Sequence, residues 1–469
     1  MSRRRAGGAI PLSSILWVGL VACSTQGESD LVLENVGLVD VTTGTVAPHD
    51  VGIRDGSITA VIPSSSGGRL SGDSVLDLSG RFLVPGFVDL HVHLPPDSLV
   101  QEEVLEQLAG YGVTTILNPG AREGAGTELR DRLGPGLPRM RTAGPIIEYL
   151  RPSQGGLDWA VTVESAAAMR EEVVRQANGG VDLIKLYAGV PPELVEAAVE
   201  EASTFGLPVA LHAGETLWTE AADLGVSMLV HSGYGTPMDE IVNLEDPAGA
   251  SDPEWYAAYA DAPSGPRFRR LVQSLVSQGV VVVPTLAITQ AAGLGGDATL
   301  LPGFETHLAP EADLPGWWGE GWRDRHPQHG EVSAAEEVLL AEVYWPGVLD
   351  ITRALFDAGV TLGVGTDVGN AWINPGTSFH YEMGLYAEAG IPPAEILAMA
   401  TLEGARALGL ADSIGTVAVG KRADLVVLSA DPTRDIRATR QIEYVLIGGD
   451  FVPSAAPPRS PPLPQPPGR

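Results

Sequence analysis

The sequence predicts an α/β fold: a (β/α)8 TIM barrel with a small β-sandwich domain built from both ends of the chain. Between residues 84 and 408, apolar runs of strand length alternate with helical segments. The flanking segments, 31–83 and 409–453, instead carry short alternating strands separated by turn signals. Strands alternating with helices are typical of a parallel sheet, and eight apolar runs favour closure into a barrel.

The first 22 residues are predicted to be a lipoprotein signal peptide. A basic start precedes an apolar stretch that is too short to span a bilayer as a mature helix. The stretch ends Leu20-Val-Ala-Cys23, which resembles a bacterial lipobox, and Cys23 is the only cysteine. We expect lipidation of Cys23, with an ordinary signal peptide and an incidental cysteine as the alternative. Ser24 after the cysteine favours the outer membrane, so the protein is expected in the cell envelope, facing the periplasm.

Beyond a polar tether, residues 23–30, the two flanks are expected to form one composite β domain. Strand patterns occur at Leu31–Val39, Val51–Arg54 and Ile58–Ile62, and similar patterns return at Leu425–Leu428 and Tyr444–Ile447. Residues 454–469 hold seven prolines in sixteen positions, which predicts a disordered or extended tail. The lipid anchor would be the only membrane contact, and the net charge of −30 argues against nucleic acid as a partner.

The eight apolar runs of the barrel are each followed by a loop, and barrel enzymes place their chemistry at such strand ends. A helix such as Pro191–Ser203 begins with prolines suited to a first turn. The predicted strands are Phe82–Leu90, Thr114–Leu117, Arg141–Ile147, Leu183–Leu186, Val209–Leu211, Met228–Val230, Val280–Pro284 and Thr361–Val364.

Six residues with metal-binding side chains lie at these strand ends: His91, His93, Lys185, His212, His231 and Asp367. His91 and His93 are two apart, so a strand points both side chains to one face. Histidine with a carboxylate-type oxygen suits zinc better than magnesium or calcium. We expect two zinc ions, with His212 and His231 holding the second.

Lysine is rare in this chain, which contains only Lys185 and Lys421 against 27 arginines. A buried lysine can lose its proton, whereas arginine effectively cannot. An uncharged amine can react with carbon dioxide to give a carbamate, an oxygen ligand able to bridge two metal ions. Lys185 is therefore the expected bridge in carboxylated form, and Lys421, in a turn, is expected to be structural.

These motifs resemble the amidohydrolase superfamily. The similarity includes Gly86-Phe-Val-Asp-Leu-His91-Val-His93, the strand-end lysine, the later histidines, Val364-Gly-Thr-Asp367 and the ending Gly415-Thr-Val-Ala-Val-Gly-Lys421. The phrase Gly279-Val-Val-Val-Val-Pro-Thr-Leu286 resembles the imidazolonepropionase-like and Xaa-Pro dipeptidase-like branch. The expected activity is hydrolysis of an amide or peptide bond in a small substrate, such as a dipeptide or N-acyl amino acid. Metal-bound hydroxide would attack, with Asp367 as proton shuttle.

Substrate contacts are predicted from the loops after the strands. Tyr149 and Arg151 follow the third strand, and Arg151 could pair with a substrate carboxylate. Tyr234 could donate a hydrogen bond to the developing oxyanion, and His380, at the start of a helix after the eighth strand, is a further possible contact. The segment 287–345 contains Trp317, Trp318 and Trp322 and could form a lid.

Two other functions compete with this hypothesis, and the oligomeric state stays open. His212-Ala-Gly-Glu215 resembles the histidine and acidic partner of mononuclear deaminases, so a deaminase or cyclic-amide hydrolase is the first alternative. A lysine ligand is unnecessary in such a site. The second alternative is a non-enzymatic binding lipoprotein, which would be expected to have lost at least one ligand.

Overall fold

The computed structural model describes residues 29–95, 98–149, 159–233, 240–244, 251–293, 338–370 and 373–453. Several residues predicted above to be functional lie outside this part of the chain: Cys23, Arg151, Tyr234, Trp317, Trp318 and Trp322. The segments predicted to be a signal peptide and a disordered tail lie outside it as well. Among the described helices, none has the length and apolar character needed to cross a membrane.

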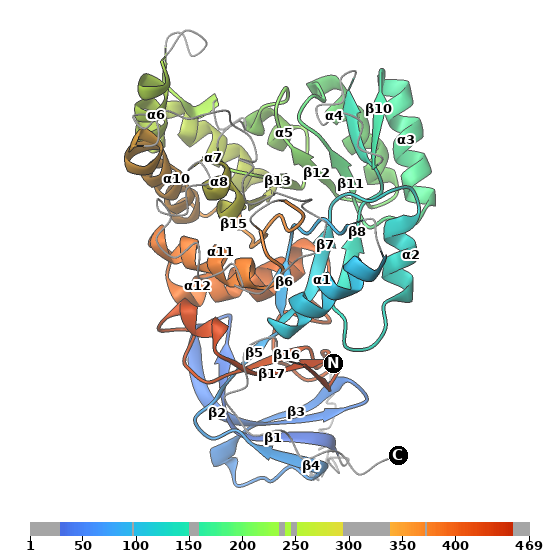
Figure 1. Ribbon diagram of the computed structural model, residues 1–469, viewed down its shortest axis with the longest axis vertical. Helices are drawn as coiled ribbons and strands as arrows, with labels where there is room; N and C mark the ends of the chain where they lie inside the picture. The colour runs from blue at the N-terminus through green and yellow to red at the C-terminus, as the bar shows by residue number, and fades with distance from the viewer. Residues whose placement is uncertain are drawn as a thin grey trace, which may run out of the picture.

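Strands from both ends of the chain share one eight-stranded sheet, which forms the lower part of the molecule in Figure 1. Its order is β18-β17-β16-β5-β1-β2-β3, and β4 pairs with β1. Leu33, Leu83 and Leu425 are buried in its apolar core. The composite origin of this sheet agrees with the sequence pattern, whereas a sandwich of two facing sheets stays a prediction. The strands are β1 (Ser29–Asp40), β2 (Thr45–Arg54), β3 (Ser57–Pro63), β4 (Gly72–Asp77), β5 (Phe82–Pro85), β16 (Leu425–Leu428), β17 (Ile442–Ile447) and β18 (Asp450–Val452).

Above this sheet, two parallel sheets form an α/β body. The three-stranded sheet consists of β6 (Phe87–Asp89), β7 (Val113–Asn118) and β8 (Arg139–Thr142). The seven-stranded sheet has the order β10-β9-β11-β12-β13-β14-β15. Its strands are β9 (Ile146–Tyr149), β10 (Ala160–Val163), β11 (Ile184–Leu186), β12 (Val209–His212), β13 (Met228–Val230), β14 (Val281–Val283) and β15 (Thr361–Leu362).

Backbone contacts join the edges of the two parallel sheets. Ala143, just after β8, forms a parallel bridge with Leu183, just before β11. On the other side, Val92 bridges to Val368, and the Leu90 amide donates to the Val364 carbonyl at 2.9 Å. The second contact brings the segment after β6 beside the segment after β15, which carry His91 and Asp367 respectively.

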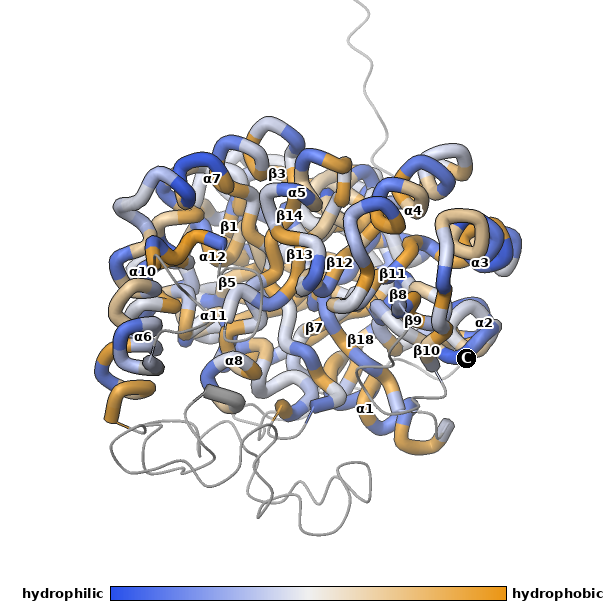
Figure 2. The backbone as a smooth tube through the Cα atoms, turned by 90° about the horizontal axis from the view of Figure 1, so that it is seen from above, coloured by the Kyte–Doolittle hydropathy of each residue, from blue (hydrophilic) through white to orange (hydrophobic). Residues whose placement is uncertain are grey.

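Helices surround the parallel strands, as Figure 2 shows from above. Helix α4 illustrates why they form: proline occupies its first turn, and its buried face consists of Leu194, Val195, Ala198 and other small apolar residues. This agrees with the helix predicted at Pro191–Ser203. The main helices are α1 (Ser98–Gly110), α2 (Ala125–Arg132), α3 (Ala166–Asn178), α4 (Pro192–Thr204), α5 (Trp218–Asp223), α6 (Asp252–Asp261), α7 (Pro266–Gln278), α8 (Leu286–Gly293), α10 (Trp345–Asp357), α11 (Thr377–Glu388), α12 (Pro393–Ala398) and α13 (Gly404–Ala407).

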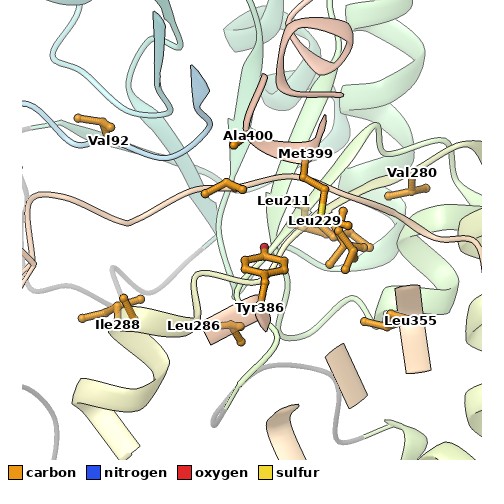
Figure 3. Packing of buried hydrophobic residues seen from close by; sticks show 14 of the residues in the cluster. Val92, Leu211, Leu229, Val280, Leu286, Ile288, Leu355, Tyr386, Met399 and Ala400 are labelled. Atoms are coloured by element: carbon orange, nitrogen blue, oxygen red, sulfur yellow. The ribbon is translucent and has the colours of Figure 1, made fainter. Parts of the chain in front are cut away.

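The core of the body packs helices α8 and α11 against the strands. Leu211 and Leu229 from neighbouring strands, Leu286 from α8 and Tyr386 from α11 belong to one buried cluster, part of which is drawn in Figure 3. The Tyr386 hydroxyl donates to the Gly363 carbonyl at 2.8 Å, directly after β15. Helix α11 is therefore fixed to the strand end that precedes Asp367.

The third predicted strand, Arg141–Ile147, is wrong as a single element, because the chain forms two strands, β8 and β9. Pro145 lies between them and has no amide hydrogen for a ladder. Its carbonyl instead accepts a hydrogen bond from the Gln176 side chain at 2.8 Å. Tyr149 consequently lies within a strand that pairs with β10, and not in a loop after the strand.

Candidate metal centre

The six predicted ligands all lie at or near carboxyl ends of the parallel strands. His91 and His93 follow β6, Lys185 is the central residue of β11, and His212 ends β12. His231 follows β13, and Asp367 lies beyond β15. Lys185 and His91 are each 1% exposed, and Asp367 is 6% exposed. The ligands therefore come from different strands, and His93, His212 and His231 are partly exposed to solvent.

Three donor atoms form a compact triangle. The distance between His91 Nε2 and His93 Nε2 is 3.2 Å, and these atoms lie 3.4 and 3.5 Å from Asp367 Oδ1. In tetrahedral zinc sites with metal–ligand bonds of about 2.0–2.1 Å, neighbouring ligand atoms are about 3.3–3.4 Å apart. The triangle thus has the dimensions of one face of a zinc coordination sphere.

His231 and His212 extend this group. His231 Nδ1 lies 4.0 Å from Asp367 Oδ2, and ligand atoms of His91, His231 and Asp367 all fall within 4.8 Å of one another. The His212 and His231 rings are 4.5 Å apart between centroids. All four histidines interact electrostatically with Lys185, which places the amine among them.

Burial favours the uncharged forms of the histidines and of the lysine. Desolvation is the main cause that lowers the pKa values of His93 and His212 to about 3, and Lys185 lowers them further. Desolvation lowers the pKa of Lys185 to about 7, although Asp367 opposes the shift. The pKa of Asp367 is raised to about 7 by desolvation, against the effect of Lys185. Neutral imidazole is the form that binds a metal ion, and the lysine amine is substantially uncharged near neutral pH.

Four buried atoms of this group have no hydrogen-bond partner among the described residues: His91 Nδ1, His93 Nδ1, Lys185 Nζ and Asp367 Oδ1. Leaving a buried polar group unsatisfied typically costs about 1–3 kcal/mol. One of them, Asp367 Oδ1, is a corner of the triangle shared with the Nε2 atoms of His91 and His93, so a cation bound there would satisfy it. The donor set therefore fits a metal centre.

Asp89 holds two of the ligands in place, a role that the sequence analysis did not assign. Its buried carboxylate accepts hydrogen bonds from the His91 amide at 3.1 Å and from both the amide and the hydroxyl of Thr366. Asp367, the next residue, has a left-handed φ of 64°. An aspartate two residues before a histidine pair in an apolar run was the available signal.

Two of the predicted substrate contacts, Tyr149 and His380, lie in the described part of the chain. Tyr149 lies partly buried in β9. His380 is buried in α11, and its ring nitrogens face the Tyr111 carbonyl and the Thr439 hydroxyl, each at 3.0 Å. The ring packs edge-on against Phe87, the first residue of β6, whereas the ligands follow the other end of that strand.

Two aromatic residues that the sequence analysis missed flank the ligands. The Trp159 and His93 ring centroids are 5.0 Å apart, and those of Tyr187 and His212 are 4.6 Å apart. Tyr187 is two residues beyond Lys185, so an i, i+2 pattern was its only sequence signal. Lys421 donates to the carbonyls of Ala411 and Ile414, which agrees with its predicted structural role.

Comparisons with known proteins agree with this architecture. A structure of a Xaa-Pro dipeptidase with bound methionine superposes with a TM-score of 0.64 and 20% identity, covering 90% of this chain and 99% of the other. A bottromycin amidohydrolase superposes with a TM-score of 0.67 and 26% identity, covering 90% and 86%.

Sequence relatives match over shorter stretches. An adenine deaminase of Desulforamulus reducens is 37% identical over 91 residues, which is 19% of this chain and 15% of the deaminase. One from Geobacillus kaustophilus is 30% identical over 106 residues, 23% of this chain and 17% of that enzyme. The chain thus spans under a fifth of the length of these relatives.

The amidohydrolase family matches residues 82–227 and 341–452, more than half of the chain. These segments contain five of the six converging ligands and the strands that carry them; His231 lies in the interval between the segments. The chain therefore belongs to the amidohydrolase family, a family of hydrolases that act on carbon–nitrogen bonds.

Proposed function

We propose that this protein is a zinc-dependent amidohydrolase with two metal ions bridged by carboxylated Lys185. The observation that carries the proposal is the position of Lys185. Its amine is buried, interacts electrostatically with all four histidines and has no hydrogen-bond partner in the described part of the chain. A structural lysine would normally have an acceptor for its ammonium hydrogens. A carbamate would instead supply two oxygen atoms to the surrounding site.

Carboxylation requires the uncharged amine, and the pKa of about 7 for Lys185 provides it near neutral pH. The nitrogen lone pair forms a bond to the carbon of carbon dioxide, and one proton leaves the nitrogen. The product is an anionic carbamate. A single negative charge then replaces a neutral amine, which suits a site that holds divalent ions.

In this assignment His91, His93 and Asp367 would hold one ion, and His212 and His231 the other. When bound, the divalent ions supply Lewis acidity that activates water and polarises a carbonyl. Asp367 would accept a proton at its carboxylate and transfer it to the leaving amine. A raised pKa of about 7 lets this carboxyl group exchange a proton near neutral pH.

We propose further that the parallel strands form a closed (β/α)8 barrel. The bridges Ala143–Leu183 and Val92–Val368 support closure, because they connect both edges of the three-stranded sheet to the seven-stranded one. Strands β9 and β10 would then not be counted among the eight strands of the ring. Strand β9 pairs with Leu186 of β11, beyond the point where Ala143 bridges to Leu183.

The proposed substrate is a small amide or peptide with a free carboxylate, such as a dipeptide or N-acyl amino acid. The 26% identity to a bottromycin amidohydrolase supports an amide substrate. Trp159 and Tyr187, beside the ligand histidines, would contact an apolar side chain. Arg151, Tyr149 and Tyr234 remain proposed contacts to the substrate's polar groups.

A panel of dipeptides and N-acyl amino acids, assayed with zinc-loaded protein, tests this function. We expect release of the free amine from at least one carboxylate-terminated substrate and slower turnover of its C-terminal amide. The Asp367→Asn variant should lose this activity while still folding. Turnover confined to lactones or phosphate triesters would contradict the proposal.

A mononuclear deaminase is the second candidate, because the adenine deaminases match parts of this chain at 30–37% identity. Such an enzyme would release ammonia from adenine, which the same preparation can be tested for. The buried amine of Lys185 argues against it, because a single ion would leave Lys185 without a function.

We also propose that the mature protein is a lipid-anchored protein of the outer membrane facing the periplasm. The lipobox-like Leu20-Val-Ala-Cys23 supports this. Metabolic labelling with palmitate should mark the wild-type chain and not Cys23→Ala. Equal labelling of both would contradict lipidation at Cys23.

A further inference from the structure

Thr285, two residues after the end of β14, contacts a proposed ligand. Its Oγ1 lies 2.8 Å from His231 Nδ1, and the same hydroxyl donates to the Pro284 carbonyl at 2.7 Å. With its single proton directed at that carbonyl, Oγ1 is able to accept a hydrogen bond from the His231 ring. In that arrangement Nδ1 carries the ring proton, and Nε2 is the nitrogen available to a metal ion.

The backbone around this contact is unusual. His231 and Thr285 adopt left-handed φ values of 65° and 51°. Threonine is β-branched, and such residues rarely occupy this region because the side chain crowds the backbone. Surrounding contacts must hold the turn in this conformation.

Glu382 of α11 supplies such contacts. Its two carboxylate oxygens accept hydrogen bonds from the amides of Leu286 and Ala287, at 2.7 and 2.6 Å. These amides belong to the first turn of α8, where the helix offers them no acceptor. Tyr381 adds a second link between the helices by donating to Gln290 at 2.6 Å.

Glu382 is fully buried, and desolvation raises the pKa of its carboxyl group to about 8, with no arginine or lysine of the described segments opposing the shift. Burying a carboxylate in this way is costly. An ordinary cap for α8 could be provided by a neutral side chain. Glu382 accepts hydrogen bonds from the amide of Leu286, the residue that follows Thr285, and from the amide of Ala287. This location indicates a more specific role, which is to hold the turn that carries Thr285.

We infer that Thr285, held by Glu382, is a positioning residue that fixes the tautomer and orientation of His231 for metal binding. The inference rests on the metal centre of the proposed function. It extends the site from its ligands to a chain of contacts that runs from α11 through the start of α8 to His231. Loss of a partner that orients a metal-binding histidine typically weakens metal affinity by about 10–100-fold.

The test is zinc affinity of the full-length protein, measured by competition with a chromophoric chelator. Thr285→Val keeps the shape but removes the hydroxyl, so we expect affinity about 10–100-fold weaker. Thr285→Ser, which keeps the hydroxyl, should bind close to wild type. Glu382→Gln should weaken binding as well, because its amide nitrogen cannot accept a backbone hydrogen. The matched control is Thr352→Val in α10, which removes a buried hydroxyl bonded to the Val348 carbonyl.

A merely structural role for Thr285 would lower stability in both valine variants and leave zinc affinity unchanged. Wild-type affinity in Thr285→Val and Glu382→Gln therefore overturns the inference. If Thr285→Val does not fold, Glu382→Gln alone decides in the same way. Absence of zinc binding by the wild-type protein would overturn the proposed metal centre itself, which separates the two failures.

Discussion

Asp89 and Thr366 are 277 positions apart in the chain, yet they are joined by two buried hydrogen bonds. The Thr366 hydroxyl donates to Asp89 Oδ2 at 2.7 Å, and its amide donates to Oδ1 at 3.1 Å. Asp89 also accepts from the His91 amide. One carboxylate therefore sets the spacing between His91 and Asp367, the residues that bracket the proposed first metal position.

Replacing Asp89 with alanine should destabilise the protein strongly. Two backbone amides and a hydroxyl would lose their acceptor, and each buried unsatisfied group costs about 1–3 kcal/mol. We expect urea denaturation to give a free energy of unfolding lower by about 2–5 kcal/mol. Asp77→Ala is the control, since Asp77 makes similar bonds to Ser79 on the surface. A loss no larger than that of the control would contradict the role of Asp89.

Gly365 is predicted to tolerate no side chain. A Cβ there would lie 2.5 Å from Val283 Cγ1 and 3.0 Å from His91 Cβ. Gly365→Ala should lower the free energy of unfolding by about 1–3 kcal/mol and weaken zinc binding. Gly384→Ala in α11, where a Cβ meets nothing within 4 Å, should be neutral or stabilising by about 0.5–1 kcal/mol. Equal unfolding midpoints for the two variants would show that the packing beside His91 is looser than described.

The positions of the ligands could be predicted from sequence, whereas their supports could not. His91 and His93 are revealed by strand periodicity, and Lys185 by the scarcity of lysine. The role of Asp89 depends on its hydrogen bonds to Thr366, which lies 277 positions away in the chain. No local sequence pattern reveals such a contact. His380 is expected from the sequence at the start of the helix after the eighth strand, where α11 begins, but the burial of its ring depends on contacts that the sequence does not reveal. Pro145 separates β8 from β9 because it has no amide hydrogen for a ladder. Where β9 begins is decided by its pairing with β10 and β11, which the local sequence does not reveal.

Carboxylation of Lys185 predicts a specific pattern of variants. Lys185→Ala should lose most activity, and short carboxylic acids should restore part of it by supplying the missing oxygen ligand. Lys185→Arg should be equally inactive without rescue by acid, because a guanidinium fills the space and cannot become a carbamate. Steady-state rates with and without added acetate measure this. Full activity in either variant would favour the deaminase hypothesis.

The metal-free protein should show a lysine-dependent change of stability with pH. The folded-state pKa of Lys185 is about 7 against an ordinary 10.5, so the unfolded chain binds the extra proton between these values. Its contribution to stability is present above pH 10.5 and is lost as the pH falls through 7. The thermal unfolding temperature, measured in carbon dioxide-free buffer, should therefore fall more steeply from pH 10 to pH 7 in wild type than in Lys185→Met. Parallel curves would mean that the amine is better solvated than the structure indicates.

The most direct test of the binuclear centre is the metal content of the purified protein, determined by elemental analysis after equilibration with zinc and bicarbonate. The account predicts close to two zinc ions per chain in wild type and no more than one in Lys185→Ala. The surface-turn variant Lys421→Ala should keep the wild-type content. About one ion in wild type, or an unchanged two in Lys185→Ala, would contradict a lysine-bridged pair of metal ions.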